Sequence, residues 1–284
     1  MATRTTVITG GNSGIGLETA VALATLGDRV LICCRSEQKA KVAAEDIRLR
    51  SGNDSVETVV LDLTSFASVR AAAEDLSERA PVIDVLINNA GLVLSRRQET
   101  VDGFEATFGT NHLGHFMLTV LLEHQIRAAV RPRVVNVSSI AASMAWGGLN
   151  FDDLQARRRY IGWLAYARSK LANIYFTQEL AHRWPDVAVN SLHPGAVATH
   201  FGHDGDTSKL EAFAMRIGSK IVMVTPERGA ATSIFLATAP EGERETGTYW
   251  VRCRHGRLPP WAKRHEDARR LWEVSQRYVA QGHP

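Results

Sequence analysis

A tyrosine and a lysine, Tyr166 and Lys170, stand four residues apart in a stretch rich in helix-forming residues. Residues at this spacing share one face of a helix, so the two side chains can lie side by side. A lysine ammonium beside a phenol favours the phenolate and lowers the tyrosine pKa. A phenol tuned in this way can pass a proton to or from a carbonyl or alcohol oxygen. Tyr-x-x-x-Lys also arises by chance, so the pair needs support from other residues.

Polar and small residues at the ends of predicted strands supply that support. Ser138 and Ser139 close one predicted strand, and the Asn-Asn-Ala-Gly run at 88–91 closes another. Parallel sheets bind their ligands at the carboxyl ends of the strands, so a serine hydroxyl there can hydrogen-bond a reacting oxygen. The small residues of 88–91 would let a cofactor lie against the backbone. Asn111 lies inside a predicted helix although asparagine is a poor helix former. Strand-end turns and a surface amide are the alternative interpretations.

A glycine-rich turn occupies residues 9–16, between the first predicted strand and the first predicted helix. Gly10 would allow a tight turn, Gly14 a close approach of the backbone to a pyrophosphate, and Gly16 close packing of helix and strand. The helix N-terminus presents free N–H groups and its positive dipole end to phosphates. The spacing is Gly-x-x-x-Gly-x-Gly. A generic glycine-rich turn is the alternative, but the strand–turn–helix placement favours dinucleotide binding.

The end of the second predicted strand indicates which dinucleotide is bound. NAD sites usually carry an acidic residue there for the ribose 2′-hydroxyl, whereas this chain reads Cys34-Arg35-Ser36 with no acid before Glu37. A guanidinium suits a 2′-phosphate, and Ser36 and Lys39 can add donors. The sequence therefore predicts NADP(H) in preference to NAD. A solvated surface charge is the alternative reading of Arg35.

These residues need a scaffold that brings strand ends together. Short runs rich in Val, Ile and Leu alternate with longer stretches of helical period. Strands are predicted at 5–9, 29–34, 56–61, 85–88, 133–138, 187–193 and 248–251. Helices are predicted at 14–26, 37–49, 64–79, 101–127, 160–183, 226–238 and 265–280, with one or two more within 206–224. This order predicts an α/β fold with a doubly wound, Rossmann-type parallel sheet covered on both faces.

Length and composition fit one globular unit. The chain has 284 residues, 45% of them hydrophobic and 22% charged, which argues against disorder or a fibrous repeat. We expect one domain over 1–252 and a C-terminal extension over 253–284. The net charge of +3 is too small to suggest a nucleic-acid partner. Residues 252–277 carry eight Lys/Arg and three Asp/Glu, so the remainder has 25 basic and 27 acidic residues and is slightly acidic.

Several other classes of site or location are not favoured. The N-terminus lacks the apolar region of a signal peptide, and no apolar run is long enough for a membrane span, so we expect a cytoplasmic protein. Cys33 and Cys34 lie in an apolar run and read as buried thiols in a reducing compartment. His112 and His115, like His200 and His203, stand three apart, but no cluster has convincing metal-ligand spacing. We therefore expect no metal.

Taken in order, these motifs resemble the short-chain dehydrogenase/reductase family over about residues 4–252. The resemblance rests on the glycine-rich turn at 9–16, the 88–91 run, Asn111, Ser139, Tyr166, Lys170 and Pro194-Gly195. Stretches such as 110–118 (TNHLGHFML) and 133–142 (RVVNVSSIAA) look most like the retinol-dehydrogenase-like branch, which also contains protochlorophyllide-reductase relatives.

The resemblance implies roles for individual residues. Tyr166 would be the general acid/base, and Lys170 would lower its pKa and hold the nicotinamide ribose. Ser139, rather than Ser138, would polarise the substrate carbonyl. Asn111 would hold a water in a proton relay. The implied cofactor contacts are Gly10, Asn12, Ser13, Gly14, Ile15, Gly16, Arg35, Ser36, Lys39, Asp62, Leu63, Asn89, Ala90, Gly91, Tyr166, Lys170, Pro194, Gly195, Val197 and Thr199, with Asp62 at the adenine and 194–199 over the nicotinamide carboxamide and the pyrophosphate.

The leading expectation is an NADPH-dependent enzyme that interconverts a ketone or aldehyde and an alcohol. Phe213, Met215 and Ile217 make the expected substrate lid at 200–224 apolar, which favours a lipophilic or aromatic small molecule. Reduction of a conjugated C=C bond is one alternative, and a non-catalytic NADP(H)-binding protein is another. In many relatives the helices corresponding to 101–127 and 160–183 pair subunits, so a homodimer or homotetramer is an open expectation.

Overall fold

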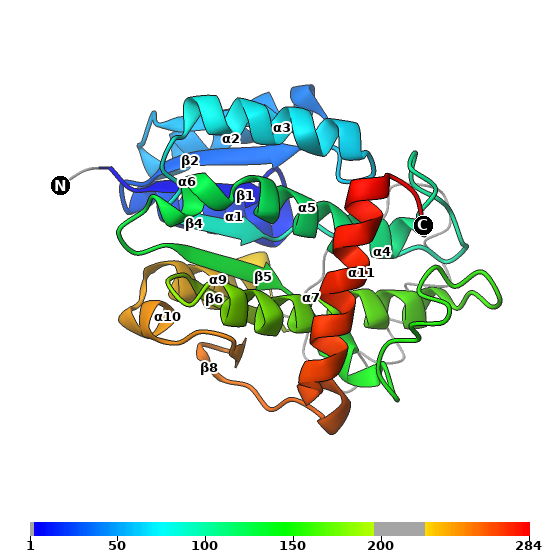
Figure 1. The fold of residues 1–284 in the computed structure, drawn as a ribbon. Coiled ribbons are helices and arrows are strands. Elements are labelled where there is room, and N and C mark those ends of the chain that lie inside the picture. The colour runs from blue at the N-terminus through cyan, green and yellow to red at the C-terminus, as the bar shows by residue number, and fades with distance from the viewer. Residues whose placement is uncertain (1–2, 196–224) are drawn as a thin grey trace.

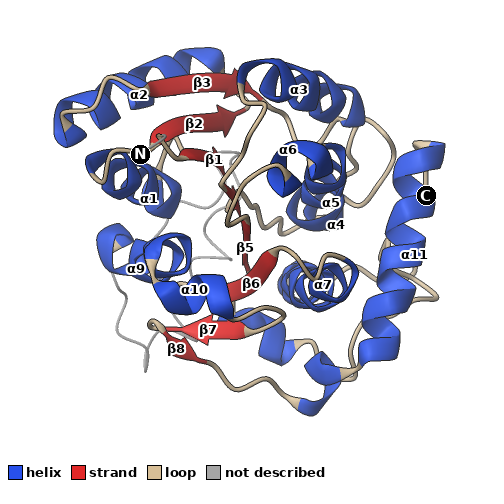
Figure 2. Ribbon diagram, turned by 60° about the vertical axis from the view of Figure 1, so that its left-hand side comes forward, coloured by secondary structure: helices blue, strands red, loops and turns tan. Residues whose placement is uncertain are grey.

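Eight strands form one sheet in the order β3-β2-β1-β4-β5-β6-β7-β8, in a computed structural model that describes residues 3–195 and 225–284 (Figures 1 and 2). All neighbouring pairs are parallel except β7 and β8. The strands are β1 (Thr5–Thr9), β2 (Arg29–Cys34), β3 (Val56–Val60), β4 (Val85–Asn88), β5 (Arg133–Val137), β6 (Ala188–His193), β7 (Tyr249–Val251) and β8 (Arg254–His255). The predicted doubly wound parallel sheet is confirmed.

Helices cover both faces of this sheet (Figure 2). One face carries α1 (Gly14–Thr25), α2 (Glu37–Ser51), α9 (Pro226–Thr238) and α10 (Pro240–Arg244). The other face carries α3 (Phe66–Arg79), α4 (Ala106–Phe108), α5 (Gly114–Leu121), α6 (Glu123–Arg127), α7 (Gly162–Arg183) and α11 (His265–Gln281). Two hydrophobic cores fill the spaces between helices and sheet. Strands buried on both faces explain the near-continuous apolar runs in the sequence.

Local signals set the helix boundaries. Ser36 caps α2 by accepting a hydrogen bond from the Lys39 amide, and Gly52 ends that helix in the left-handed conformation at φ 68°. Ser65 caps α3 in the same way. These are the side-chain cap and glycine stop that such helices use to satisfy their free backbone groups.

The helix predicted over 101–127 is present only from Ala106 onward and is not one regular α-helix. The chain instead forms α4, a π-helical segment at Gly109–Leu113, then α5 and α6. Two glycines allow the backbone to pack closely here. A Cβ on Gly109 would lie 2.6 Å from the Thr100 methyl, and one on Gly114 would lie 2.8 Å from the Leu63 carbonyl oxygen. Single π turns inside helices are frequent at functional sites.

The C-terminal part also differs from the prediction. The last predicted strand is β7, but the chain then turns through Arg252 and Cys253, at φ 50° and 59°, into β8. The helix predicted at 265–280 is α11. The helices expected within 206–224 lie outside the described residues.

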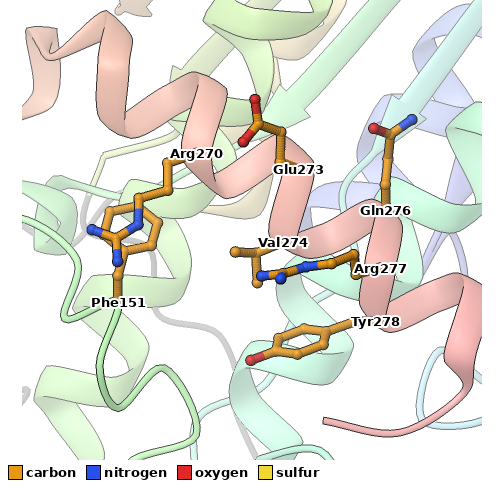
Figure 3. A pocket seen from close by; sticks show the side chains of 7 residues that line it. All are labelled: Phe151, Arg270, Glu273, Val274, Gln276, Arg277 and Tyr278. Atoms are coloured by element: carbon orange, nitrogen blue, oxygen red, sulfur yellow. The ribbon is translucent and has the colours of Figure 1, made fainter.

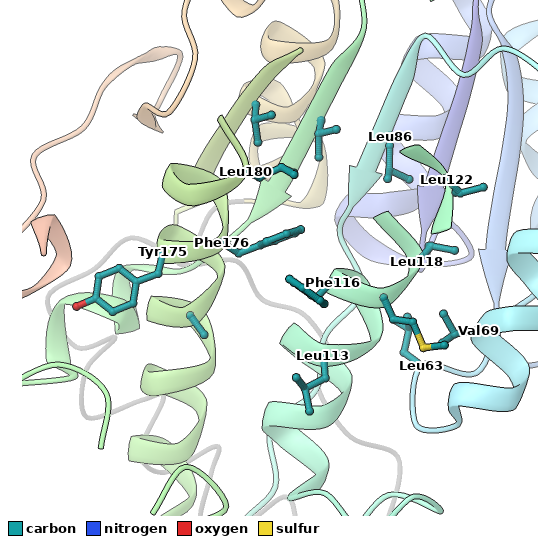
Figure 4. Close-up of a cluster of buried hydrophobic side chains, with 14 of the residues drawn as sticks. Leu63, Val69, Leu86, Leu113, Phe116, Leu118, Leu122, Tyr175, Phe176 and Leu180 are labelled. Atoms are coloured by element: carbon teal, nitrogen blue, oxygen red, sulfur yellow. The ribbon is translucent and has the colours of Figure 1, made fainter. Parts of the chain in front are cut away.

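The helix α11 packs across the outer side of α7 and passes over α5 (Figure 1). Figure 4 shows Phe116 of α5 and Phe176 of α7 facing each other in the core. Leu271 and Trp272 are buried, and the Trp272 ring meets Phe116 of α5 at 4.9 Å and Phe176 of α7 at 6.1 Å between ring centroids. The basic C-terminal stretch is therefore joined to the main core. It also covers the two helices that the family resemblance assigns to a subunit interface.

Candidate functional site

Ser139, Tyr166 and Lys170 come together at the carboxyl end of β5, where Ser139 follows the strand and α7 supplies the other two. The Tyr166 phenol lies within the influence of the Ser139 hydroxyl, which acts to lower the pKa of the phenol. The Lys170 ammonium lies 5.8 Å from the centre of the Tyr166 ring. The three residues singled out from the sequence thus form one group, with two hydroxyls adjacent and a cation close by.

Lys170 is held at this place by two hydrogen bonds, one to the last residue of β5 and one to the residue after it. Its Nζ donates to the Val137 carbonyl at 3.0 Å, and its own carbonyl accepts from the Ser138 hydroxyl at 2.7 Å. Lys170 is only 3% exposed, and burial lowers its pKa to about 8. Ser138 therefore fixes α7 against β5, while Ser139 is the serine whose hydroxyl reaches the phenol.

The pKa of Tyr166 differs from the expectation drawn from the Tyr-x-x-x-Lys spacing. Burial raises the pKa of the phenol, and the Ser139 hydroxyl opposes this rise. The Lys170 ammonium donates to the Val137 carbonyl. A neutral phenol with a high pKa is protonated at neutral pH, which is the form a general acid needs.

Asn111 lies in the π-helical segment and is fully buried. Its Oδ1 accepts from the Leu92 amide at 2.8 Å, and its Nδ2 donates to the Leu92 carbonyl and to the Ser169 hydroxyl, both at 2.9 Å. Both amide hydrogens are therefore engaged. The side chain ties the segment after β4 to α7, next to Lys170.

The glycine-rich turn has the shape of a phosphate cradle. Gly10 has a φ of 66°, and a Cβ on Gly16 would lie 2.3 Å from the Gly10 carbonyl oxygen and 2.5 Å from Asn89 Nδ2. The Ser13 side chain makes no cap hydrogen bond to the start of α1. The backbone amides of Gly14, Ile15 and Gly16, in the first turn of α1, can thus bind an anion. Asn12 and Ser13 directly precede this turn. These features fit a dinucleotide pyrophosphate.

The residues predicted to select NADP(H) lie at the end of β2. Arg35 and Lys39 are exposed, and neither forms an ion pair with another described residue. Ser36 uses its oxygen to cap α2. Its hydroxyl hydrogen can still be donated. This arrangement leaves two cations and one hydroxyl that fit a phosphate group.

The remaining predicted cofactor residues flank this cradle. Asp62 accepts from the Thr64 amide and hydroxyl, so one carboxylate oxygen holds the loop that includes Leu63. Asn89 donates to the Thr9 carbonyl at 2.8 Å, beside Ala90 and Gly91. Pro194 and Gly195 follow β6, where the Gly195 amide donates to His193 Nδ1. Val197, Thr199 and the expected lid at 200–224 lie outside the described residues.

Three residues of this region carry no role in the sequence reasoning. Thr9, Ser169 and His115 link the predicted residues to one another by buried hydrogen bonds. Ser169 precedes Lys170, and His115 follows Asn111 by one helical turn, so sequence spacing could have placed both near the site. Thr9 and His115 are 106 residues apart in the chain, so no local sequence pattern could indicate their contact.

A groove runs along α11 and is lined by Phe151, Arg270, Glu273, Val274, Gln276, Arg277 and Tyr278 (Figure 3). None of these residues belongs to the group around Tyr166. Over residues 3–195 and 225–284, His, Cys, Asp and Glu nowhere gather in a group of three that could hold a metal ion. In the same ranges, no helix has the length and apolar character needed to cross a membrane.

Comparison with known proteins decides the family. A family model described as short chain dehydrogenase matches residues 4–151. Human retinol dehydrogenase 14 is 42% identical over 96% of this chain and 85% of its own length. Human retinol dehydrogenase 12 is 42% identical over 95% of this chain and 84% of its own length. This chain belongs to the short-chain dehydrogenase/reductase family. Mouse retinol dehydrogenase 13 is similar to the same extent. It is 39% identical over 97% of this chain and 84% of its own length.

Solved structures of short-chain dehydrogenases/reductases share the fold. A Mycobacterium paratuberculosis protein of uncharacterised function superimposes with a TM-score of 0.78 at 35% identity, covering 98% of this chain and 94% of that one. Pseudomonas aeruginosa RhlG, in an NADP active-site complex, superimposes with a TM-score of 0.70 at 27% identity, covering 88% and 94%. The chain is thus an oxidoreductase of a family that binds a nicotinamide cofactor and acts on small molecules.

Proposed function

We propose that this protein is an NADPH-dependent reductase that converts a ketone or aldehyde on a lipophilic or aromatic small molecule into an alcohol. The observation that carries the proposal is the placement of the Ser139 hydroxyl and the Tyr166 phenol together at the end of β5, with the Lys170 ammonium 5.8 Å from the Tyr166 ring centre. Two hydroxyls at one point can both bind a carbonyl oxygen. The uncapped start of α1 and the cations at the end of β2 support NADPH.

NADPH, when bound, supplies the hydride that adds to the carbonyl carbon. Ser139 holds the carbonyl oxygen by a hydrogen bond and polarises the C=O bond. Tyr166 donates its phenolic proton to that oxygen, so that the C=O π bond becomes C–H and O–H bonds. The resulting phenolate lies near the Lys170 ammonium, which favours the charged form. Asn111 holds α7 and the segment at the end of β4 in fixed positions relative to each other during the reaction.

A lipophilic substrate is supported by exposed apolar side chains that follow Ser139 in the chain. Ile140, directly after Ser139, is 43% exposed, and Trp146, a few residues further on, is 72% exposed. The relatives at about 40% identity are named for retinol, an apolar alcohol. Exposed apolar groups beside a polar site are typical of pockets for apolar ligands with one oriented polar group.

Substitution of Tyr166 by Phe tests the proposal. The variant lacks only the phenolic oxygen, so we expect NADPH binding to persist while turnover falls by about 10²-fold or more. Oxidation of NADPH would be followed with a panel of aliphatic, aromatic and polyene carbonyls, and the products would be analysed. A saturated C=C bond in the product would favour the alternative reaction, and unchanged turnover in the variant would refute the role of Tyr166.

A further inference from the structure

The buried residue His115 lies between the catalytic group and the phosphate-binding turn. It belongs to α5, one helical turn after Asn111, and is 1% exposed. Its Nδ1 lies 3.0 Å from the Asn111 carbonyl oxygen, and its Nε2 lies 2.8 Å from the Thr9 hydroxyl. The ring therefore bridges the π-helical segment and the carboxyl end of β1.

The hydrogen bonds fix which ring nitrogen carries the proton. A carbonyl oxygen can only accept, so His115 Nδ1 must donate to Asn111. Burial lowers the pKa of His115 to about 4, so the ring is neutral at neutral pH and Nε2 must accept from Thr9. The Thr9 oxygen in turn accepts from the amides of Asn89 at 2.9 Å and Ala90 at 3.0 Å. The Thr9 hydroxyl also lies 3.5 Å from the Ile87 carbonyl oxygen, which is farther than its distance to His115 Nε2.

These bonds connect elements that hold different parts of the site. Thr9 and Asn89 border the glycine-rich turn, since Asn89 Nδ2 donates to the Thr9 carbonyl. The segment after Ala90 is bound by Asn111, which also bonds Ser169 of α7. A Cβ on Gly91 would lie 3.1 Å from Lys170 Nζ and 3.3 Å from Asn111 Oδ1, so this segment lies directly beside the catalytic lysine.

We propose that His115 is a positioning residue that couples the cofactor-binding turn to the catalytic group through Thr9 on one side and Asn111 on the other. The expected effect on kcat rests on the proposed function. Neutral imidazole is suited to this task because it offers one donor and one acceptor on opposite sides of a rigid ring. Loss of either bond leaves a buried polar group without its partner.

The test replaces His115 by Phe, which keeps a ring but removes both polar atoms. We expect NADPH affinity to fall by roughly fivefold and kcat by about tenfold, because two buried hydrogen bonds are lost. The variant Thr9→Val should act in the same direction, and the double variant should be no worse than the worse single variant, since both break one chain. His115→Gln, which offers a donor and an acceptor, should recover part of both losses.

The control is His112→Phe. His112 is equally buried, three residues earlier, but bonds Ser275 of α11 at 2.9 Å instead of the site. It should lower the free energy of unfolding while leaving NADPH affinity and kcat unchanged. A His115→Phe enzyme that loses only stability, as this control does, would overturn the proposal. Additive effects of His115→Phe and Thr9→Val would overturn it as well.

Two readouts do not depend on turnover. Affinity for NADPH is measured by fluorescence, and nitrogen NMR of the wild-type protein should show His115 as the neutral Nδ1–H tautomer at pH 7. A wild-type protein that binds NADPH but reduces no carbonyl would refute the proposed function alone, because the affinities of the His115 and Thr9 variants would still report the coupling. A charged ring or the opposite tautomer would refute the coupling alone.

Discussion

The ammonium of Lys170 donates a 3.0 Å hydrogen bond to the carbonyl of Val137, the last residue of β5. Burial lowers the pKa of Lys170 to about 8, so its charge is present below that pH and lost above it. In the proposed reaction, proton donation would leave a phenolate on Tyr166, which the charged lysine would stabilise. We therefore expect kcat for carbonyl reduction to be high below pH 8 and to fall as the pH rises through about 8.

The variant Lys170→Met removes the charge and retains the length of the side chain. It should lower kcat by about 10²-fold or more and show no decline of the remaining activity around pH 8. The measurement is kcat between pH 6 and pH 10 at saturating NADPH. A variant that kept the same decline would show that another group causes it.

Arg35 should decide between NADPH and NADH. It is exposed at the end of β2 without an ion-pair partner among the described residues, so its guanidinium can bind a 2′-phosphate. Loss of a charge-assisted hydrogen bond costs about 1.5–3 kcal/mol, so Arg35→Asp should weaken NADPH binding by roughly 10- to 100-fold. The new carboxylate can accept from the ribose hydroxyls of NADH, and affinity for NADH should rise.

The control for this prediction is Lys41→Ala on α2, the helix that follows Arg35. Lys41 pairs with Glu37 at 2.7 Å and is exposed, so its loss should leave both affinities unchanged. The two affinities are measured by titration of each coenzyme. If Arg35→Asp and Lys41→Ala have equal NADPH affinities, Arg35 is a solvated surface charge.

Gly16→Ala tests the shape of the phosphate-binding turn. Its Cβ would lie 2.3 Å from a backbone oxygen, a distance that requires the turn to open. We expect loss of measurable NADPH binding and a lower unfolding temperature. Gly52→Asn is the control, because Gly52 at the end of α2 has a φ of 68° and has no atom within 4 Å of a Cβ. Asparagine tolerates this conformation, so binding should persist.

The buried histidines should make stability depend on pH. Burial lowers the pKa of His112 to about 3, whereas an unfolded histidine titrates near 6.5. Between these values the unfolded chain binds more protons, so the free energy of unfolding falls as the pH drops below 6.5. One such site contributes about 2 kcal/mol between pH 6.5 and pH 5. Denaturant unfolding at both pH values should show a smaller change in His112→Phe than in the wild type.

The sequence shows the local parts of this site and not the contacts between them. The turn at 9–16 and the Tyr166/Lys170 spacing are visible because strand, turn and helix are neighbours in the chain. The π-helical segment around Asn111 is not, since one extra residue in a turn hardly changes an apolar pattern of helical period. The bond between Thr9 and His115 is also hidden, because it depends on how β1 and α5 pack.

The helix α11 should contribute strongly to stability. Trp272 is 5% exposed, packs on Phe116 and Phe176, and lies under the Arg183 guanidinium at 4.7 Å. Trp272→Ala should lower the free energy of unfolding by about 3–5 kcal/mol, because it leaves a cavity between α11, α5 and α7. Arg269→Ala on the same helix removes only an exposed ion pair with Glu273 at 3.8 Å and should cost less than about 1 kcal/mol. Equal midpoints of urea unfolding for the two variants would mean that α11 is a solvated appendage.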